Sequence, residues 1–129
     1  MSTETILQEI AESMPLSKNE LDLRENGQGF GLIIVDEVNG FATVGAGNLA
    51  PQTPNEQVSM MVAETDRLAR AFTKQKVPVL ALLDTHDPGK PEPPYPPHCE
   101  RGTGEEDLVP ELKWLENDPQ ATLVRKDCI

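Results

Sequence analysis

Two short apolar segments, residues 30–36 and 77–83, constrain the fold of this chain more than any other feature of its sequence. Each is a continuous run rich in branched aliphatic side chains, which is typical of a strand buried on both faces of a sheet. Residues 53–76 between them carry apolar side chains at three- and four-residue steps, which predicts a helix with one buried face. A strand, a helix and a strand in this order predict a βαβ unit with parallel strands and a right-handed crossover.

Local signals mark the start and the end of this helix. Thr53 is predicted to cap its N-terminus, because Pro54 suits the first helical position and Glu56 completes a capping box with Thr53. Lys74 and Lys76 suit the C-terminal end, where a positive charge interacts favourably with the helix dipole. We therefore expect the crossover between the two strands to be a single helix with defined ends.

The chain is expected to divide into residues 1–29 and residues 30–129. The first part is predicted to hold a helix over residues 4–13, which Pro15 ends, and a polar connector over residues 17–29. The second part is long enough for one domain with a modest core.

This second part is predicted to be the N-terminal part of a single α/β domain. After the two strands, residues 107–116 carry leucines at helical spacing, and residues 121–124 are typical of a third strand. A parallel sheet needs cover on both faces, yet the chain ends at Ile129, soon after this strand. We therefore expect the domain to be incomplete at its C-terminal end.

The charge of the chain restricts its partners. Its 11 Lys and Arg residues against 22 Asp and Glu residues give a formal net charge of −11. Nucleic acids and anionic membranes are themselves negative, so we expect neither as a partner and favour a small-molecule substrate. The N-terminus has no signal-peptide pattern, no apolar run reaches the roughly 20 residues of a membrane span, and two cysteines make no disulfide framework. These features predict a cytoplasmic protein, with the nucleus as an alternative location.

A carboxylate and two imidazoles follow the second strand. Asp84 and His86 are two residues apart, so in extended chain their side chains point the same way. His98 comes after a proline-rich loop that could fold back toward them. This donor set suits zinc first, or iron or manganese, and Glu92 could add a fourth ligand. We predict a site for one divalent metal, against the alternative of a solvated loop with two unrelated histidines.

Asp36 and Lys126 also stand where predicted strands end, which is where open parallel sheets bind ligands. Asp36 could be a general base or a charge partner, or could simply make a hydrogen bond in a turn. Lys126 could serve the same site or be a surface lysine. Cys99 and Cys128 could be nucleophiles only with a base and a lowered pKa, so we favour a small buried residue at both positions.

Five segments carry a resemblance to a known family: residues 32–41, 84–86, 95–99, 102–103 and 125–129. In this order they are similar to the isochorismatase-like cysteine hydrolases, and most closely to the plant-type nicotinamidases. The resemblance implies a three-layer αβα fold with a parallel sheet. It also implies hydrolysis of nicotinamide to nicotinate and ammonia through a cysteine thioester, a step of NAD salvage.

The resemblance assigns roles to the candidate residues. It implies that Asp36 takes the proton of the nucleophile and that the charge of Lys126 favours a thiolate. Phe41 and Tyr95 match aromatic residues that flank the substrate ring. The metal of the family holds the pyridine nitrogen of the substrate. The residues that match its ligands are Asp84, His86 and His98.

Two departures from the family pattern limit the expected activity. Many members have a third histidine between the two present here, and Glu92 is the nearest substitute. The family nucleophile lies beyond the lysine, on a turn that also supplies oxyanion-binding N–H groups, and neither Cys99 nor Cys128 matches that position. We therefore expect the chain alone to lack meaningful amidase activity, because triad members act as a unit.

Two alternatives to a nicotinamidase stay open at this point. The chain could be a non-catalytic, truncated metal- or ligand-binding paralogue. It could also be another hydrolase of the superfamily, acting on isochorismate or a carbamoyl compound. In either case, the full-length protein could form a homo-oligomer.

Overall fold

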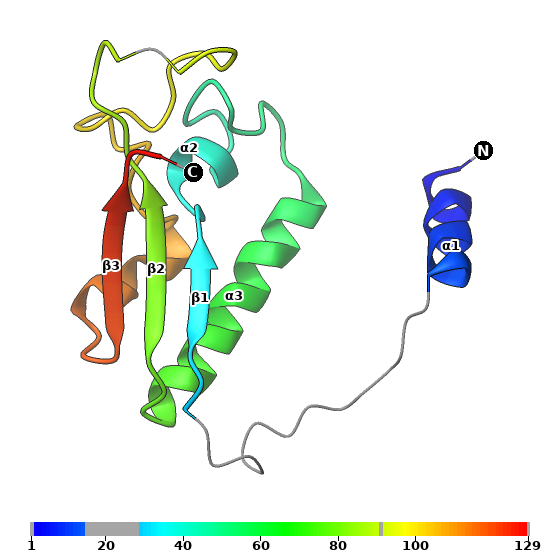
Figure 1. Ribbon diagram of the computed structural model, residues 1–129, viewed down its shortest axis with the longest axis horizontal. Coiled ribbons are helices and arrows are strands. Elements are labelled where there is room, and N and C mark those ends of the chain that lie inside the picture. Colours follow the sequence, from blue (N-terminus) through cyan, green and yellow to red (C-terminus); the bar gives the residue numbers. More distant parts are fainter. Residues whose placement is uncertain (1, 15–28, 91, 129) are drawn as a thin grey trace.

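The computed structural model describes residues 2–14, 29–90 and 92–128 (Figure 1). Its elements are α1 (Thr3–Ser13), β1 (Leu32–Val35), α2 (Asn39–Ala42), α3 (Glu56–Lys74), β2 (Val79–Asp84), the 3-10 helix η1 (Pro110–Asn117) and β3 (Ala121–Lys126). The predicted N-terminal helix is confirmed as α1, whereas its predicted end at Pro15 and nearly all of the predicted connector lie outside the described residues. No helix in the described ranges has both the length and the apolar character that crossing a bilayer requires.

Three parallel strands form one sheet with β2 in the middle. β1 pairs with β2 from Leu32 opposite Val79 onward, and β2 pairs with β3 up to Asp84 opposite Lys126. α3 connects β1 to β2, so the predicted βαβ unit is confirmed. Because the strands are parallel, their carboxyl ends meet at one edge of the sheet, and Asp36 follows β1 at that same edge.

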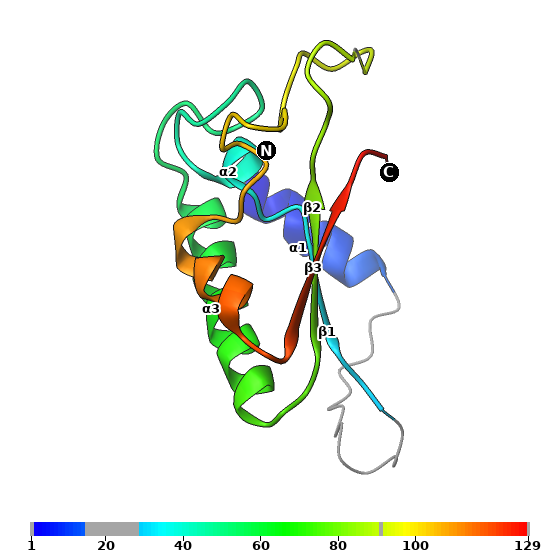
Figure 2. The same cartoon turned by 90° about the vertical axis from the view of Figure 1, so that its left-hand side faces the viewer.

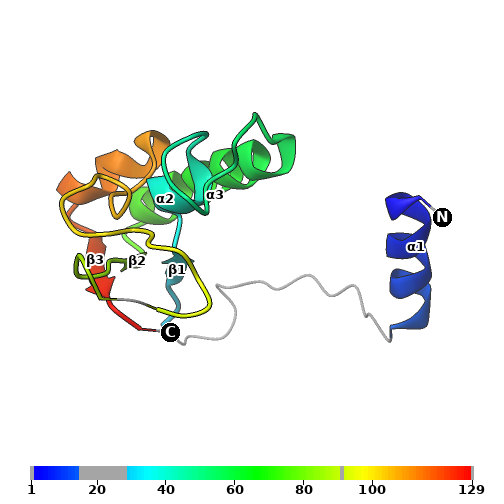
Figure 3. The ribbon, with the colours of Figure 1, turned by 90° about the horizontal axis from the view of Figure 1, so that it is seen from above.

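In the described part of the chain, helices cover one face of the sheet. Figures 2 and 3 show α2, α3 and η1 on the same side of the three strands. The core lies between these two layers, with Ile34, Leu83 and Leu112 among its buried side chains. On the other face, Ile33 and Val35 are 62% and 54% exposed. The described residues therefore supply two layers of the expected three, and the alternation along β1 separates a packed face from an open one.

Two helical segments differ in detail from their predicted form. α3 is capped by Asn55, whose side chain accepts a hydrogen bond from the Val58 N–H (3.1 Å). The predicted cap at Thr53 is wrong, because an equally good capping residue stands two positions closer to the helix. The segment predicted as a helix over residues 107–116 is a 3-10 helix that begins at Pro110, where a missing N–H costs nothing.

The long loop after β2 folds back over the carboxyl end of the sheet (Figures 1 and 3). The His86 N–H donates to the Cys99 carbonyl (3.0 Å), and the Arg101 N–H donates to the His86 carbonyl (2.8 Å). Further along, the Glu106 carboxylate accepts hydrogen bonds from two backbone N–H groups of a glycine-containing turn (2.6 and 2.8 Å). These contacts fix the loop on the edge of the sheet where the candidate residues lie.

Candidate metal and substrate site

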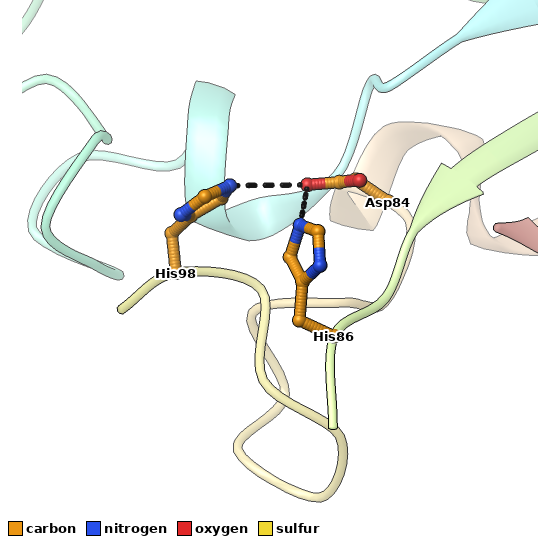
Figure 4. A group of neighbouring side chains, drawn as sticks. All are labelled: Asp84, His86 and His98. Carbon is orange, nitrogen blue, oxygen red and sulfur yellow. Dashed lines mark hydrogen bonds and ion pairs between the residues drawn. The ribbon is translucent and has the colours of Figure 1, made fainter. Parts of the chain in front are cut away.

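Asp84, His86 and His98 lie together, as the sequence predicted. The Nε2 atoms of His86 and His98 are 2.9 and 3.4 Å from the same oxygen of Asp84, Oδ2 (Figure 4). All three side chains are buried, and one ligand atom from each lies within 4.8 Å of the others. The cluster therefore presents one carboxylate oxygen and two imidazole nitrogens to a common point, which suits a divalent metal.

Two elements of the fold bring these ligands together. Asp84 is the last residue of β2, and His86 follows two residues later on the same side of the extended chain. His98 arrives from the far end of the loop, where its Nδ1 lies 2.8 Å from the Pro96 carbonyl. The predicted fold-back of the proline-rich loop is thus what carries the second imidazole to the strand end.

Glu92, the fourth ligand predicted from the loop, lies beside the same cluster. Its Oε2 is 3.3 Å from His86 Nε2 and 3.4 Å from His98 Nε2. Its side chain is 35% exposed, so it stands at the solvent edge of a cluster whose other members are buried. A second carboxylate oxygen therefore faces both imidazole nitrogens.

The surroundings of the two histidines fit a metal centre. Nδ1 of His86 contacts Asp127 Oδ1 (3.0 Å) and Nδ1 of His98 contacts the Pro96 carbonyl, so Nε2 of each ring faces the cluster. Burial opposes protonation of His86, but the hydrogen bond to Asp127 and the two cluster carboxylates outweigh it and raise the pKa of this imidazole. The site concentrates negative charge around two imidazoles, where a divalent cation can replace protons.

Asp36 and Lys126 meet at the second oxygen of Asp84. Lys126 Nζ lies 3.1 Å from Asp36 Oδ2 and 3.3 Å from Asp84 Oδ1. Burial works to lower the pKa of Lys126, but both carboxylates outweigh it and raise that pKa, so the lysine is charged at neutral pH. Asp36 has a φ of 58°, a left-handed conformation that is found at functional sites more often than elsewhere. Its Oδ1 is buried without a hydrogen-bond partner among the described residues, so it can accept a proton from a bound group.

A pocket of about 190 Å³ joins these two groups of residues. Phe41 and Tyr95, predicted to flank a substrate ring, have ring centroids 5.6 and 6.0 Å from that of His98. Leu49 also lines the pocket and was not predicted from the sequence. The only sequence feature that could have indicated it is an apolar side chain in a glycine-rich loop. The full lining is Asp36, Phe41, Leu49, Asp84, Glu92, Tyr95, His98 and Lys126. Of the predicted site residues, only His86 is absent from it.

The two cysteines are poorly placed to act as the nucleophile. Cys99 is fully buried, and the backbone of Gly40 packs so closely on its Sγ that an added Cβ would lie 2.7 Å away. Burial, followed by the charges of nearby carboxylates, raises the pKa of Cys99 to about 12, so its thiol is neutral at physiological pH. Cys128 is exposed and does not line the pocket. The expectation of a buried residue is confirmed for Cys99 and wrong for Cys128, which lies just past the end of β3.

The family described as the isochorismatase domain matches residues 30–128 of the chain. This chain belongs to the isochorismatase family. The match spans all three strands and every residue of the candidate site. The resemblance found in the sequence and the expected fold class are therefore confirmed.

Relatives of this isochorismatase-family chain are substantially longer. Nicotinamidase 1 of Arabidopsis thaliana is 52% identical over 126 residues, which cover 98% of this chain and 52% of that protein. The chain thus spans about half the length of the curated relative it matches. A solved nicotinamidase/pyrazinamidase from Bacillus subtilis shares 23% identity at a TM-score of 0.63, over 77% of this chain and 56% of that one. A Pyrococcus horikoshii pyrazinamidase in complex with zinc shares 21% identity at a TM-score of 0.53, over 74% and 50%. These two structures share the fold of this chain.

Proposed function

We propose that this protein has the site of a nicotinamidase-like amidohydrolase, an enzyme that converts nicotinamide to nicotinate and ammonia through a cysteine thioester, and that these 129 residues lack the expected nucleophile cysteine. The observation that carries the proposal is the meeting of two groups in one pocket, the Asp84–His86–His98 cluster and the Asp36–Lys126 pair. The 52% identity with the Arabidopsis nicotinamidase supports this substrate. The pocket volume of about 190 Å³ supports a compact ring, because pockets for drug-sized ligands start at roughly 300 Å³.

Four residues would hold the metal. Asp84, His86 and His98 provide three donors, and Glu92 provides the fourth. When bound, the metal would act as a Lewis acid that holds the pyridine nitrogen of nicotinamide. We propose zinc first, because the Pyrococcus pyrazinamidase is in complex with zinc, and iron or manganese suit the same donors.

The apolar walls of the pocket would orient the ring. Phe41 and Tyr95 lie near His98 on its substrate side, where they can flank a flat heteroaromatic ring. Leu49 completes this apolar part of the wall. The carboxamide would then point toward Asp36 and Lys126, which line the remainder of the pocket.

The Asp36–Lys126 pair suits cysteine chemistry. Asp36 Oδ1 can accept the thiol proton of a nucleophile, and the ammonium group of Lys126 favours a thiolate and the negative charge that develops during attack. The thiolate would attack the carboxamide carbon, and the proton taken by Asp36 would pass to the departing nitrogen, so that the C–N bond breaks and ammonia leaves a thioester. Water would then add to the thioester carbon and release nicotinate and the free thiol. Cys99 is too deeply buried for this role, and Cys128 lies outside the pocket lining.

Neither cysteine lines the pocket, which favours a second candidate function for a protein of these 129 residues. This second function is metal-dependent binding of nicotinamide without turnover. Both functions use the same pocket, and they differ only in ammonia release.

The two candidates separate in one experiment on the purified chain with zinc. We expect nicotinamide to bind without ammonia release above the uncatalysed rate. Phe41→Ala should weaken binding by about 0.5–1.5 kcal/mol, because it removes a stacking ring, whereas Phe30→Ala, which alters a ring pair remote from the pocket, should leave it unchanged. Ammonia release at an enzymatic rate would favour the enzyme over the binding protein, and an absence of binding would contradict both.

The proposed reaction also suggests a biological setting. It would place the protein in NAD salvage, in the cytoplasm, with the nucleus as the alternative location. Fractionation of cells that express a tagged protein would measure that location, and light scattering of the full-length protein would measure whether it forms a homo-oligomer.

A further inference from the structure

Asp127 contacts the metal cluster without belonging to it. Its Oδ1 lies 3.0 Å from Nδ1 of His86, the ring nitrogen that faces away from Asp84 and His98. Asp127 does not line the substrate pocket. Its role in the site, if it has one, must therefore act through His86.

Strand pairing brings Asp127 to this position. β3 pairs with β2 so that Lys126 lies opposite Asp84, and the Thr85 N–H donates to the Lys126 carbonyl (2.8 Å). Thr85 and Asp127, the residues that follow β2 and β3, therefore leave the sheet side by side. Lys126, the last residue of β3, contacts Asp84, and Asp127, the next residue, contacts His86.

A second contact holds the Asp127 carboxylate in place. Lys90, from the loop that carries Glu92, donates a hydrogen bond to its other oxygen, Oδ2. Each oxygen of Asp127 thus has its own partner, and the carboxylate is held in one orientation from two sides. The pair also ties the metal loop to the end of β3.

An acceptor at Nδ1 determines what Nε2 can do. Each ring nitrogen of His86 faces a carboxylate, Nδ1 that of Asp127 (3.0 Å) and Nε2 that of Asp84 (2.9 Å). A neutral imidazole carries one proton, so an acceptor at Nδ1 lets the ring keep that proton there when Nε2 binds a metal. The Nε2 lone pair then faces Asp84 and Glu92, where a metal ligand must present it. His98 gains the same arrangement from the Pro96 carbonyl, which no side-chain substitution removes, so Asp127 is the partner that mutation can test.

We propose that Asp127 is a positioning residue of the metal centre, which fixes the tautomer and the ring orientation of His86 so that Nε2 can bind the metal. This inference rests on the proposed metal-dependent function. Partners of this kind orient the ligand and raise its basicity, and their loss typically lowers metal affinity by roughly 10- to 100-fold.

Calorimetric titration of the chain with zinc tests the proposal. We expect Asp127→Ala to weaken zinc binding by roughly 10- to 100-fold and Asp127→Asn to weaken it less, because the amide oxygen still accepts a hydrogen bond. Asp87→Asn is the matched control. Asp87 follows His86 in the sequence but pairs with Arg101 at the surface, so the zinc affinity of this variant should equal that of the wild type. If the Ala variant does not fold, the zinc affinities of the wild type and of the nearly isosteric Asn variant are compared instead.

A second readout follows the tautomer directly. The chain has two histidines, so nitrogen NMR at a pH where both rings are neutral can resolve His86. Because Asp84 competes for a proton on Nε2, we expect both forms in the metal-free wild type and a smaller share of the Nδ1–H form in Asp127→Ala. Unchanged zinc affinity and an unchanged tautomer in the folded variants would overturn the role of Asp127. Failure of the wild type to bind zinc would instead contradict the proposed metal site itself.

Discussion

Lys126 lies between two carboxylates that serve different parts of the proposed site. Asp36 is the proposed proton acceptor, and Asp84 is a proposed metal ligand, yet Lys126 Nζ is 3.1 and 3.3 Å from their oxygens. One ammonium group therefore faces two carboxylates and offsets one of their two negative charges. Asp84 contacts Lys126 with one oxygen and the two histidines with the other, so Lys126 connects Asp36 to the proposed metal cluster.

Glu37, next in sequence to Asp36, illustrates the cost of a buried charge. Its carboxylate accepts a hydrogen bond from the Thr65 hydroxyl (2.6 Å), but its other oxygen is buried without a partner among the described residues. Burial raises the pKa of Glu37 above its ordinary value of 4.5, and the Thr65 hydrogen bond only partly opposes this. The stability contributed by the protonated form is fully present below the unfolded-state pKa and is lost as the pH rises through the folded-state pKa.

Glu37→Gln should therefore stabilise the protein at neutral pH. The variant removes the buried charge and keeps an acceptor for Thr65, so we expect its free energy of unfolding at pH 7 to rise by on the order of 1 kcal/mol. The gain should shrink as the pH falls through the raised folded-state pKa of Glu37, and it should be lost below the ordinary pKa of 4.5, where the wild-type carboxyl is neutral in both states. Urea unfolding at pH 7 and at pH 4 measures both values.

Glu64→Gln is the matched control for this measurement. Glu64 is an exposed residue of α3 that pairs with Arg67, and exposed pairs of this kind contribute roughly 0–1 kcal/mol. A stabilisation by Glu37→Gln that is the same at both pH values would contradict the assignment of the effect to the buried charge.

At the scale of elements, β1 separates two environments by its alternation. Ile34 is buried against the helices, whereas its neighbour Ile33 is 62% exposed on the open face. In a protein of these 129 residues, Ile34→Ala should lower the free energy of unfolding by about 2–4 kcal/mol, and Ile33→Ala by less than about 1 kcal/mol. Denaturant unfolding of the two variants measures the difference, and equal losses would show that the open face is covered in solution.

The elements themselves could be predicted well because hydrophobic periodicity determines them. Residues 30–36 and 77–83 are apolar throughout except for Asp36 at the end of the first, and both hold the expected strands. The expected burial on both faces is wrong for β1 among the described residues, because no described element covers its open face. The start of α3 could not be fixed to the residue, because Thr53 and Asn55 are both good caps and only the path of the chain selects Asn55. The 3-10 geometry of η1 likewise depends on packing that spacing does not describe.

At the scale of the whole molecule, the site could be predicted where it follows from strand ends. Asp36, Asp84 and Lys126 each terminate a predicted strand, and parallel pairing brings such residues to one edge. Leu49 and Asp127 could not be predicted, because their positions depend on the path of a loop and on the lateral register of β3 against β2. Both positions depend on residues far apart in the sequence, which local spacing does not predict.

The described chain combines an open sheet face with an assembled binding pocket. The proposed metal donors, the aromatic residues proposed to flank the ring and the charged pair all come from residues 30–128, which the isochorismatase domain matches. We therefore propose that metal and nicotinamide both bind to this chain, independently of whether turnover occurs.

Calorimetric titration with nicotinamide tests this proposal. The purified chain is titrated with one equivalent of zinc present and again after a chelator has removed the metal. We predict one nicotinamide site in the zinc-loaded chain, and no measurable binding after chelation or in the zinc-treated His98→Ala variant, because the metal then has no site from which to hold the pyridine nitrogen. Nicotinamide binding of equal affinity with and without zinc, or no binding under either condition, would contradict the claim.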